Sequence, residues 1–467
     1  MDREKYVDRT SGGVDAVVAN VACHELRYRR RSQVMEDAPR EPTAKADKPR
    51  AMIELLRDGA EVYPRWLEAI DRAVSEVLLE MYWFDSDKIG TRFADALERC
   101  AKRGVSVFVL YDGVGSFGVE ASQWERLRRA GAKVIEFHPV TPWTERFALA
   151  KVQQRDHRKI LVVDAELGFT GGINISDHNL ESDERGRGWR DDAVALRGEA
   201  VLELRALFFD TWLRAGGPLP AAGAAVGWRV KRALTQAAKS ECDATDESAF
   251  AATLDATVDV IRAAVSRRNR RTRKRSAHTI KATEAERTRP RIIGHDSWGA
   301  TRTIRNLYVK KINAARRVIL IANSYFAPDL PVRRALIAAA ERGVEVRVLV
   351  PRESDVAPVA WAGRALYAGL LAAGVHIHEW TASMLHSKTA VIDDWATVGS
   401  YNFDYRSLRY NLEVTAASED PSFVRDVEDS IREDIASSEE IRAESWSARP
   451  LYQRFVEWFF YVFRKIL

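Results

Sequence analysis

Residues 157–174 read HRKILVVDAELGFTGGIN, and residues 386–402 read HSKTAVIDDWATVGSYN. Both stretches follow one pattern, which is His-x-Lys, four further residues, Asp, and then a pair of small residues before an Asn. A single copy is easily met by chance, because it fixes only three positions. Two copies with nearly equal offsets in separate halves of the chain are not, so the doublet indicates a duplicated unit with one shared chemistry.

The doubled pattern suits attack on a phosphodiester. A neutral imidazole can attack phosphorus to form a phosphohistidine, and a second, protonated imidazole can donate a proton to the departing alkoxide. Lys159 and Lys388 would supply fixed positive charge for the equatorial oxygens. In His-x-Lys on a strand both side chains point to one face, because the strand period is two. His157 and His386 are therefore candidate catalytic residues, together with the two lysines.

Small and amide residues after each motif complete the candidate phosphate site. Asn174 and Asn402 are candidate phosphate ligands. Gly172 and Ser400 belong to pairs of small residues that would let the backbone approach a phosphate closely. No carboxylate cluster for a metal is visible in the sequence, so we expect neither a metal nor another cofactor.

Acidic residues near the motifs have two expected roles. A catalytic histidine usually has an acid behind its other ring nitrogen, and Asp191 and Glu413 are the candidates downstream of each motif. Asp164 and Asp393 complete the two motifs and are included in the candidate catalytic set. Their place at a strand-to-turn junction nevertheless favours holding the loop over touching a substrate.

The sequence around the motifs repeats as well. Residues 103–110 read RGVSVFVL and residues 342–349 read RGVEVRVL, which indicates two similar α/β domains packed about a pseudo-twofold axis. That axis would bring the two histidines face to face. Apolar periodicity and glycine stops predict helices over 63–75, 89–103, 123–130, 308–315, 332–342 and 362–373. Strands are predicted over 76–84, 105–111, 133–137, 159–163, 167–170, 317–322, 344–350, 375–379, 389–392 and 396–398.

Composition limits the class of protein. A chain of 467 residues is long enough for two or more domains. Lys and Arg total 72 against 67 Asp and Glu, and a net charge of +5 does not indicate a nucleic-acid binder. The three cysteines show neither a disulfide framework nor zinc spacing, which fits a reducing compartment. We expect no secretory signal and no spanning helix, because no suitable apolar run is present.

At these residues the chain resembles the phospholipase D superfamily, whose hallmark is the doubled motif, and within it the bacterial cardiolipin synthases of the type without N-terminal transmembrane helices. The similarity runs from about Ile53 to Ile441, apart from residues 229–290. It rests on the segments DHRKI at 156–160, GGINISD at 171–177, WRD at 189–191, SYF at 324–326, GSYNFD at 399–404 and NLE at 411–413.

The resemblance implies two phospholipase D-like domains, each a mixed sheet flanked by helices. It implies a metal-independent transfer of a phosphatidyl group from one phosphatidylglycerol to another through phosphohistidine, releasing glycerol. It also implies a peripheral enzyme at the cytoplasmic face of the cell membrane. Either histidine has served as the nucleophile in this superfamily. We take His157 as the nucleophile and His386 as general acid and then base.

Two features depart from the superfamily pattern. The second motif has five residues between Asp393 and Gly399, where the first has six between Asp164 and Gly171, which we interpret as a shortened turn. Residues 229–290 have no counterpart that we can place, so the entrance to the site stays undefined.

These patterns divide the chain into five parts. We expect a flexible polar tail at 1–47, a first domain at 48–228, a basic insertion at 229–290, a second domain at 291–440 and an amphipathic helix at 441–467. The basic run RRNRRTRKR at 267–275 is open to three interpretations, a solvated loop, a contact with anionic lipid, or a nucleic-acid patch. Trp143 and Phe147 either line an acyl-chain entrance or belong to the core.

The C-terminal segment carries an apolar stripe at helical spacing, with charged residues elsewhere around the helix. The stripe either lies in a membrane interface or packs onto the protein's own core. It consists of Phe455, Trp458, Phe459, Val462, Phe463 and Ile466.

Three other functions compete with phosphatidyl transfer. A phospholipase D that hydrolyses phospholipid would use the same residues, and water access alone would separate the two. A nuclease of the same superfamily is less favoured, because such nucleases often carry one motif per chain. A catalytically silent membrane scaffold is disfavoured by two intact motifs. No obligate protein partner is indicated, and oligomeric state and acceptor alcohol stay open.

Overall fold

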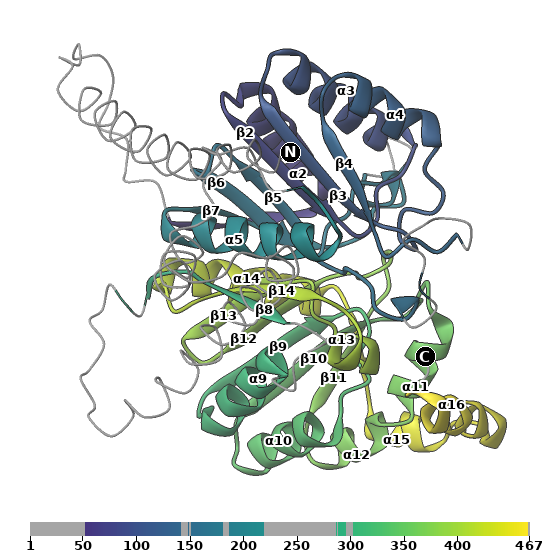
Figure 1. The fold of residues 1–467 in the computed structure, drawn as a ribbon. Helices are drawn as coiled ribbons and strands as arrows, with labels where there is room; N and C mark the ends of the chain where they lie inside the picture. The colour runs from purple at the N-terminus through teal and green to yellow at the C-terminus, as the bar shows by residue number, and fades with distance from the viewer. Residues whose placement is uncertain are drawn as a thin grey trace, which may run out of the picture. The chain divides into compact units, whose positions relative to one another are not determined.

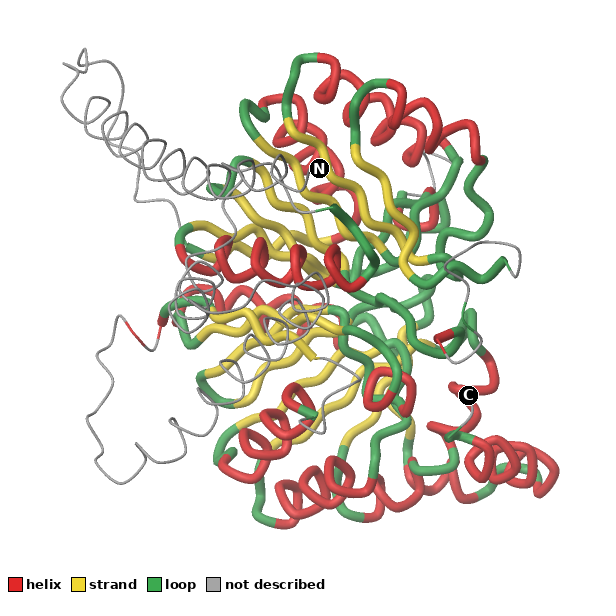
Figure 2. The backbone as a smooth tube through the Cα atoms, viewed as in Figure 1, coloured by secondary structure: helices red, strands yellow, loops and turns green. Residues whose placement is uncertain are grey.

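The computed structural model of the protein describes residues 52–141, 148, 151–180, 186–218, 286, 288–295 and 302–465. The expected N-terminal tail, the basic run and the aromatics Trp143 and Phe147 lie outside these residues, as does nearly all of the expected insertion at 229–290. The described residues form two α/β halves, each with a mixed sheet and helices against it (Figure 1 and Figure 2).

The first half contains a seven-stranded sheet in the order β1-β7-β6-β5-β2-β3-β4. Its strands are β1 (Ile53–Arg57), β2 (Glu76–Met81), β3 (Ser106–Asp112), β4 (Lys133–Phe137), β5 (Lys159–Val163), β6 (Leu167–Gly171) and β7 (Asp192–Arg197). Its helices are α2 (Asp58–Arg72), α3 (Lys88–Lys102), α4 (Ala121–Arg129) and α5 (Glu199–Arg214), with a 3-10 turn η2 (Asp177–Asn179).

The second half contains an eight-stranded sheet in the order β15-β11-β10-β9-β12-β13-β14-β8. Its strands are β8 (Arg291–His295), β9 (Val318–Asn323), β10 (Glu345–Pro351), β11 (His376–Trp380), β12 (Lys388–Ile392), β13 (Trp395–Gly399), β14 (Glu413–Ser418) and β15 (Glu439–Ile441). Its helices are α9 (Thr303–Ala314), α10 (Leu330–Glu341), α11 (Ala357–Arg364), α12 (Tyr367–Ala372), α13 (Tyr405–Arg409), α14 (Pro421–Ala436), α15 (Ala443–Ser447) and α16 (Leu451–Phe463).

The two sheets share one topology. Reading the first sheet backwards gives β4-β3-β2-β5-β6-β7-β1, which matches β11-β10-β9-β12-β13-β14-β8 of the second strand for strand. The parallel pairs β2–β3–β4 and β9–β10–β11 also correspond, and so do the antiparallel pairs that follow. The predicted α/β class and the duplication are therefore confirmed, with β15 as an addition at one edge of the second sheet.

Local chemistry explains why the helices stop where they do. Gly104 and Gly343 follow α3 and α10 with φ values of +86° and +84°, a left-handed conformation that costs glycine little. Aspartates begin several helices, because their carboxylates accept hydrogen bonds from the free N–H groups of the first turn. Asp87 accepts from Gly90 N at the start of α3, and Asp420 accepts from Phe423 N at the start of α14.

One predicted helix differs from the structure. Residues 362–373 do not form a single helix, because the chain turns near residue 365 and separates α11 from α12. Both pieces bury apolar side chains, Ala362 in the first and Leu370 in the second. The same apolar periodicity therefore runs through the break and cannot reveal it.

The core has three parts. One cluster packs α2, α3 and α4 against the first sheet, and another packs α9, α10 and α12 against the second. The third joins the halves, because α5 side chains such as Trp212 and α14 side chains such as Phe423 share one buried cluster with strands of both sheets. Figure 1 shows α5 and α14 between the two sheets. This shared core holds the two motif strands, β5 and β12, in one body.

Candidate active site

A backbone hydrogen bond joins each motif histidine to the opposite half of the chain. The N–H of His157 donates to Leu412 O at 3.0 Å, immediately before β14 of the second half. The N–H of His386 donates to Arg190 O at 2.7 Å, immediately before β7 of the first half. Each motif histidine therefore lies close to the residue after its backbone partner. For His157 that residue is Glu413, and for His386 it is Asp191.

Those following residues are the two candidate orienting acids. His386 Nδ1 lies 2.6 Å from Asp191 Oδ2, and His157 Nδ1 lies 3.1 Å from Glu413 Oε2. His157 Nδ1 is also 3.1 Å from the carbonyl oxygen of Ser400. All of these residues are buried. Each half therefore supplies the acid for the other half's histidine, and Nε2 of each ring is the nitrogen that can face a substrate.

The surroundings disfavour charge on both rings, though unequally. Burial and then the charges of Lys159 and Lys388 hold the pKa of His157 well below its usual range, and the Ser400 carbonyl opposes them. Burial and Lys388 likewise depress the pKa of His386, but here the carboxylate of Asp355 opposes them. His157 therefore sits in more positive surroundings than His386.

The motif lysines are buried next to their own histidines. Lys159 Nζ donates to His157 O at 2.7 Å, and Lys388 Nζ donates to His386 O and, at 3.0 Å, to Ser324 Oγ. Burial lowers the pKa of Lys159 to about 7 and that of Lys388 to about 8. An anionic phosphate between them would favour their charged forms.

The two candidate asparagines are buried, and Asn402 is linked to Lys388 through Ser324. Asn402 Oδ1 accepts from Ser324 Oγ at 3.0 Å, and this hydroxyl in turn accepts from Lys388 Nζ. Asn174 Oδ1 accepts from Trp83 N at 3.3 Å. With Oδ1 engaged in each case, the Nδ2 amides would be the groups that donate to a phosphate.

Gly172 and Ser400 hold the orienting acids, whereas the sequence suggested close approach to a phosphate. A Cβ on Gly172 would lie 2.2 Å from Asp191 Oδ1, so only glycine leaves room for that carboxylate. At the equivalent place in the second half, Ser400 Oγ donates to Glu413 Oε2 and accepts from Val414 N. Gly172 thus leaves space for Asp191, and Ser400 forms a hydrogen bond with Glu413.

This contact gives a first prediction. We expect Gly172→Ala to lower kcat by at least about tenfold, because the new methyl group displaces Asp191 from His386 and about 1.4 kcal/mol suffices for that factor. Gly118→Ala is the matched control, since a Cβ there meets nothing within 4 Å. Steady-state rates on a phosphodiester substrate measure both variants. Equal rates for Gly172→Ala and the wild type would contradict the role given to this glycine.

Asp164 and Asp393 lie away from the reacting groups, at the far ends of the motif strands. Asp164 accepts from the N–H groups of Val74, Ser75 and Glu76 at 2.7 to 3.3 Å. Asp393 accepts from the N–H groups of residues 316–318 at 2.9 to 3.0 Å. Their inclusion in the catalytic set is therefore corrected. Each carboxylate holds the turn before the neighbouring strand, β2 or β9.

Aromatic residues that the periodicity did not single out surround the histidines. Tyr82 follows β2 and lies edge-on to His157, with ring centroids 4.8 Å apart. Tyr325 follows β9, the equivalent strand, and its ring lies edge-on to His386 at 6.3 Å. Trp189 lies 5.4 Å from His386 on another side. The two tyrosines are not equivalent in the repeat, because Met81 pairs with Lys159 and Asn323 pairs with Lys388, so Tyr82 matches Ser324 and Tyr325 matches Trp83.

Asp192 fixes the second motif strand to the first half. Its carboxylate accepts from Ser387 Oγ at 2.5 Å, from Thr389 Oγ1 at 2.6 Å and from Arg190 Nη1 at 2.7 Å. Arg190 also contacts Asp434 of α14 at 3.0 Å. The network is buried, so it sets the separation of the two halves at the site. Among the described residues, no group of three or more His, Cys, Asp or Glu side chains is arranged to hold a metal ion.

Comparison with known proteins places this site in a family. The sequence profile described as "Cardiolipin synthase, PLD-like domain" matches residues 66–195 and 308–435, one match in each half. The chain therefore belongs to this phospholipase D-like family.

Individual relatives agree with that assignment. The chain is 32% identical to cardiolipin synthase 2 of Bacillus anthracis over 416 residues, covering 86% of this chain and 68% of that one. It is 28% identical to a probable cardiolipin synthase of Bacillus subtilis over 427 residues, covering 89% and 72%. The fold is similar to a phosphatidylserine synthase of Haemophilus influenzae, with a TM-score of 0.60 at 13% identity over 89% of this chain and 95% of that chain.

Proposed function

We propose that the protein is a cardiolipin synthase that transfers a phosphatidyl group from one phosphatidylglycerol to another through a phosphohistidine and releases glycerol. The observation that carries the proposal is the pair of buried imidazoles, each oriented through Nδ1 by an acid of the other half. Two buried lysines beside them suit one phosphodiester. The relatives named cardiolipin synthase support the choice of lipid.

In the first step, Nε2 of His157 attacks phosphorus and the bond to the headgroup glycerol breaks. The glycerol oxygen takes a proton from the imidazolium of His386, so glycerol leaves neutral. Lys159 and Lys388 balance the charge of the equatorial oxygens in the transition state. Loss of this proton leaves the His386 ring neutral, so the ring can act as a base in the second step.

In the second step, a hydroxyl of the acceptor phosphatidylglycerol gives its proton to His386. The acceptor oxygen attacks phosphorus, the phosphorus–nitrogen bond breaks, and His157 is regenerated. The products are cardiolipin and the starting enzyme. Residues of this chain supply each group that these two steps use.

The assignment of His157 as nucleophile rests on the unequal charges around the rings. Lys159 and Lys388 both disfavour protonation of His157, which keeps Nε2 free to attack and stabilises an attached phosphoryl group. His386 has the carboxylate of Asp355 within electrostatic reach and the closer orienting acid, Asp191. Those contacts favour an imidazolium, as a general acid requires.

A product assay tests the proposed function. The protein is incubated with vesicles of phosphatidylglycerol, and the lipids and free glycerol are quantified, with the His157→Ala protein as background. We expect cardiolipin and glycerol in equal amounts. Phosphatidic acid without cardiolipin would mean hydrolysis, and cleavage of single-stranded DNA with untouched lipid would mean a nuclease.

The lysines predict how the reaction depends on pH. With pKa values of about 7 and 8 they lose charge in the free enzyme as pH rises through that range. We expect kcat/KM for phosphatidylglycerol to fall there, whereas kcat falls only at higher pH, because bound phosphate favours the charged lysines. Lys159→Arg should move the kcat/KM fall upward, since guanidinium stays charged. Identical profiles for this variant and the wild type would contradict the assignment.

The C-terminal helix α16 presents an apolar surface outward. Seven large apolar side chains are 43% to 78% exposed: Leu451, Tyr452, Phe455, Trp458, Phe459, Val462 and Phe463. The opposite side packs on the body, where Phe460 lies 5.0 Å from Trp361 of α11 and Glu457 binds Arg449 at 2.7 Å. Packing of the stripe onto the protein's own core, one of the two expected roles, is thus not seen in its described residues. Ile466 lies outside them.

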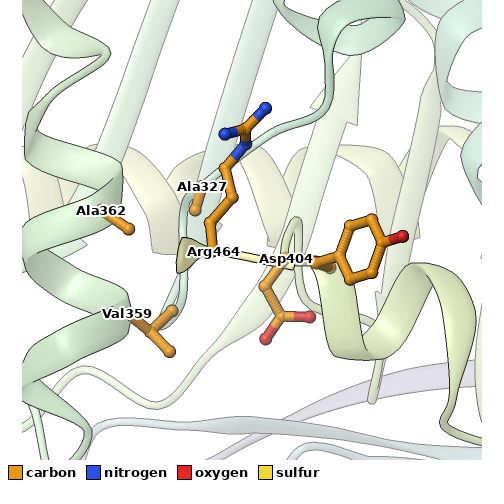
Figure 3. A pocket seen from close by; sticks show the side chains of 6 residues that line it. Ala327, Val359, Ala362, Asp404 and Arg464 are labelled. Carbon is orange, nitrogen blue, oxygen red and sulfur yellow. The ribbon is translucent and has the colours of Figure 1, made fainter. Parts of the chain in front are cut away.

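We infer that this surface of α16 binds the membrane interface. Exposed patches of this kind mark interaction sites, and aromatic amphipathic helices with basic residues lie in lipid headgroups. Arg454 on this helix and Lys465 just beyond its end are exposed and suit an anionic lipid surface. Arg464, at its end, shares a small pocket with Ala327 and Asp404, next to the second motif (Figure 3). This attachment would bring lipid close to the site.

The attachment would make the enzyme peripheral, and we place it at the cytoplasmic face of the membrane, in keeping with the free thiol of Cys100. Within the described part of the chain, no helix is long and apolar enough to cross a bilayer.

We predict that Phe455→Ser together with Trp458→Ser weakens binding to phosphatidylglycerol vesicles at least about tenfold, because buried aromatic side chains contribute roughly 1.5–3 kcal/mol each. Val74→Ser is the matched control, since Val74 is 83% exposed at the Asp164 end of the first half. Co-sedimentation with vesicles measures both. Unchanged binding of the double variant would remove α16 as the membrane contact.

A further inference from the structure

The two halves of the site differ at the position of Asp355. Four residues beyond the end of β10, Asp355 accepts from Tyr325 Oη at 2.8 and 2.9 Å through its two oxygens. Four residues beyond the end of the equivalent strand β3 stands Ser116, whose hydroxyl donates to the backbone carbonyl of Tyr82. The second half therefore carries a carboxylate bonded to the tyrosine beside its histidine, and the first half carries an uncharged hydroxyl at the matching sequence position.

Asp355 is exposed, and its carboxylate has an electrostatic effect on His386 and Lys388. It lies near enough to His386 and Lys388 to favour their charged forms, and near enough to Tyr82 across the site to raise the pKa of that phenol. Tyr325 connects the two regions, since its ring lies beside His386 and below Lys388 Nζ, 6.0 Å from the ring centroid. Through Tyr325, Asp355 is thus connected to the side of the site where His386 exchanges a proton with an alcohol.

The chain around Asp355 leads toward α16. Val356 and Trp361, which follow it, are each 39% exposed, and Trp361 packs on Phe460 of α16. A lipid headgroup that leaves a membrane bound at α16 would pass these side chains before it meets Asp355 and His386.

We propose that Asp355, held in place by Tyr325, is the binding site for the glycerol hydroxyls of the phosphatidylglycerol headgroup on the His386 side. This inference rests on the proposed function and deepens it. A carboxylate accepts several hydrogen bonds, and one phenol uses only part of that capacity, so the two hydroxyls of a glycerol group can both donate. An ammonium headgroup suits the position less well, because the positive charge of Lys388 already lies within electrostatic reach of Asp355.

Competition between soluble acceptors tests this site. The full-length protein is given phospholipid vesicles with isotopically labelled glycerol or labelled ethanol, and label in the two transfer products is measured as a function of acceptor concentration. For Asp355→Asn we expect the selectivity for glycerol over ethanol to fall about tenfold, mainly through a higher KM for glycerol, because a hydrogen bond to a charged group is lost. Tyr325→Phe should lower the same ratio less. Asp394→Asn, which removes an exposed carboxylate at the other end of β12, should leave it unchanged.

Two results would overturn the proposal. One is an unchanged ratio in Asp355→Asn, and the other is an equal loss of transfer to both acceptors, which would mean a general effect on the site. The selectivity for glycerol over ethanol is measured with any phospholipid that the wild-type protein cleaves, so the measurement does not depend on phosphatidylglycerol being the substrate. Inactivity toward phosphatidylglycerol would therefore refute the proposed function separately.

Discussion

Replacement of either His157 or His386 with Ala is expected to lower turnover of phosphatidylglycerol at least about a thousandfold, because each ring takes part in both steps of one reaction. The expected losses are similar although the two residues belong to different halves, since each is completed by an acid from the other half. The double variant should be no worse than either single one, as for groups that act as a unit. Initial rates of cardiolipin formation measure all three.

The matched control is His376→Ala. His376 is exposed on β11, where it pairs with Glu440 at 2.6 Å. It should leave the rate near that of the wild type. A near-native rate for either motif variant would mean that the two halves do not share a site, and the proposed mechanism would be wrong.

Asp191→Asn is expected to lower turnover by about 10³-fold to 10⁴-fold, the scale seen when an acid behind a catalytic histidine is made neutral. The amide would present a donor to Nδ1 of His386, so the ring would hold its proton on Nε2 and could not accept one from the acceptor alcohol. Thermal unfolding checks that the variant is folded. Because Asp191 acts through His386, a phospholipid whose leaving group departs as a stable anion should still be attacked by His157 at a measurable rate.

Glu413→Gln provides the contrasting case. The Ser400 carbonyl would still hold the proton on Nδ1, but loss of the carboxylate would weaken Nε2 as a nucleophile, so the variant should stay slow even with the activated leaving group. Equal behaviour of Asp191→Asn and Glu413→Gln with that substrate would contradict the separate roles given to the two histidines.

The sequence predicted the fold and the main elements of the site because the repeat is strong. Strands β4 and β5 were predicted at their observed ends, since they are short runs bounded by clear changes of pattern. The acids Asp191 and Glu413 were predicted from the need to orient an imidazole. The sequence could not say which acid serves which histidine, because that depends on the pairing of the motifs with the opposite half.

Other features were hidden for physical reasons. The role of Gly172 depends on a carboxylate that approaches from a different strand, so its small size had suggested contact with a phosphate instead. Asp355 is an exposed loop residue without periodicity, and only its bond to Tyr325 and its electrostatic effect on His386 single it out. Strands β7 and β14 carry buried small residues beside apolar ones, a pattern that does not distinguish them from loops.

The central claim is that one active site, built from both halves, works through a covalent intermediate on His157. It is tested most directly by mixing His386→Ala protein with a phosphatidyl ester of p-nitrophenol, which needs no general acid to leave, and quenching with detergent at mildly alkaline pH, where a phosphohistidine survives. We expect a burst of one nitrophenolate per chain and a phosphatidyl adduct on the peptide that carries His157, while His157→Ala gives neither. An adduct on His386 in the His157→Ala protein, or no burst from either variant, would contradict it.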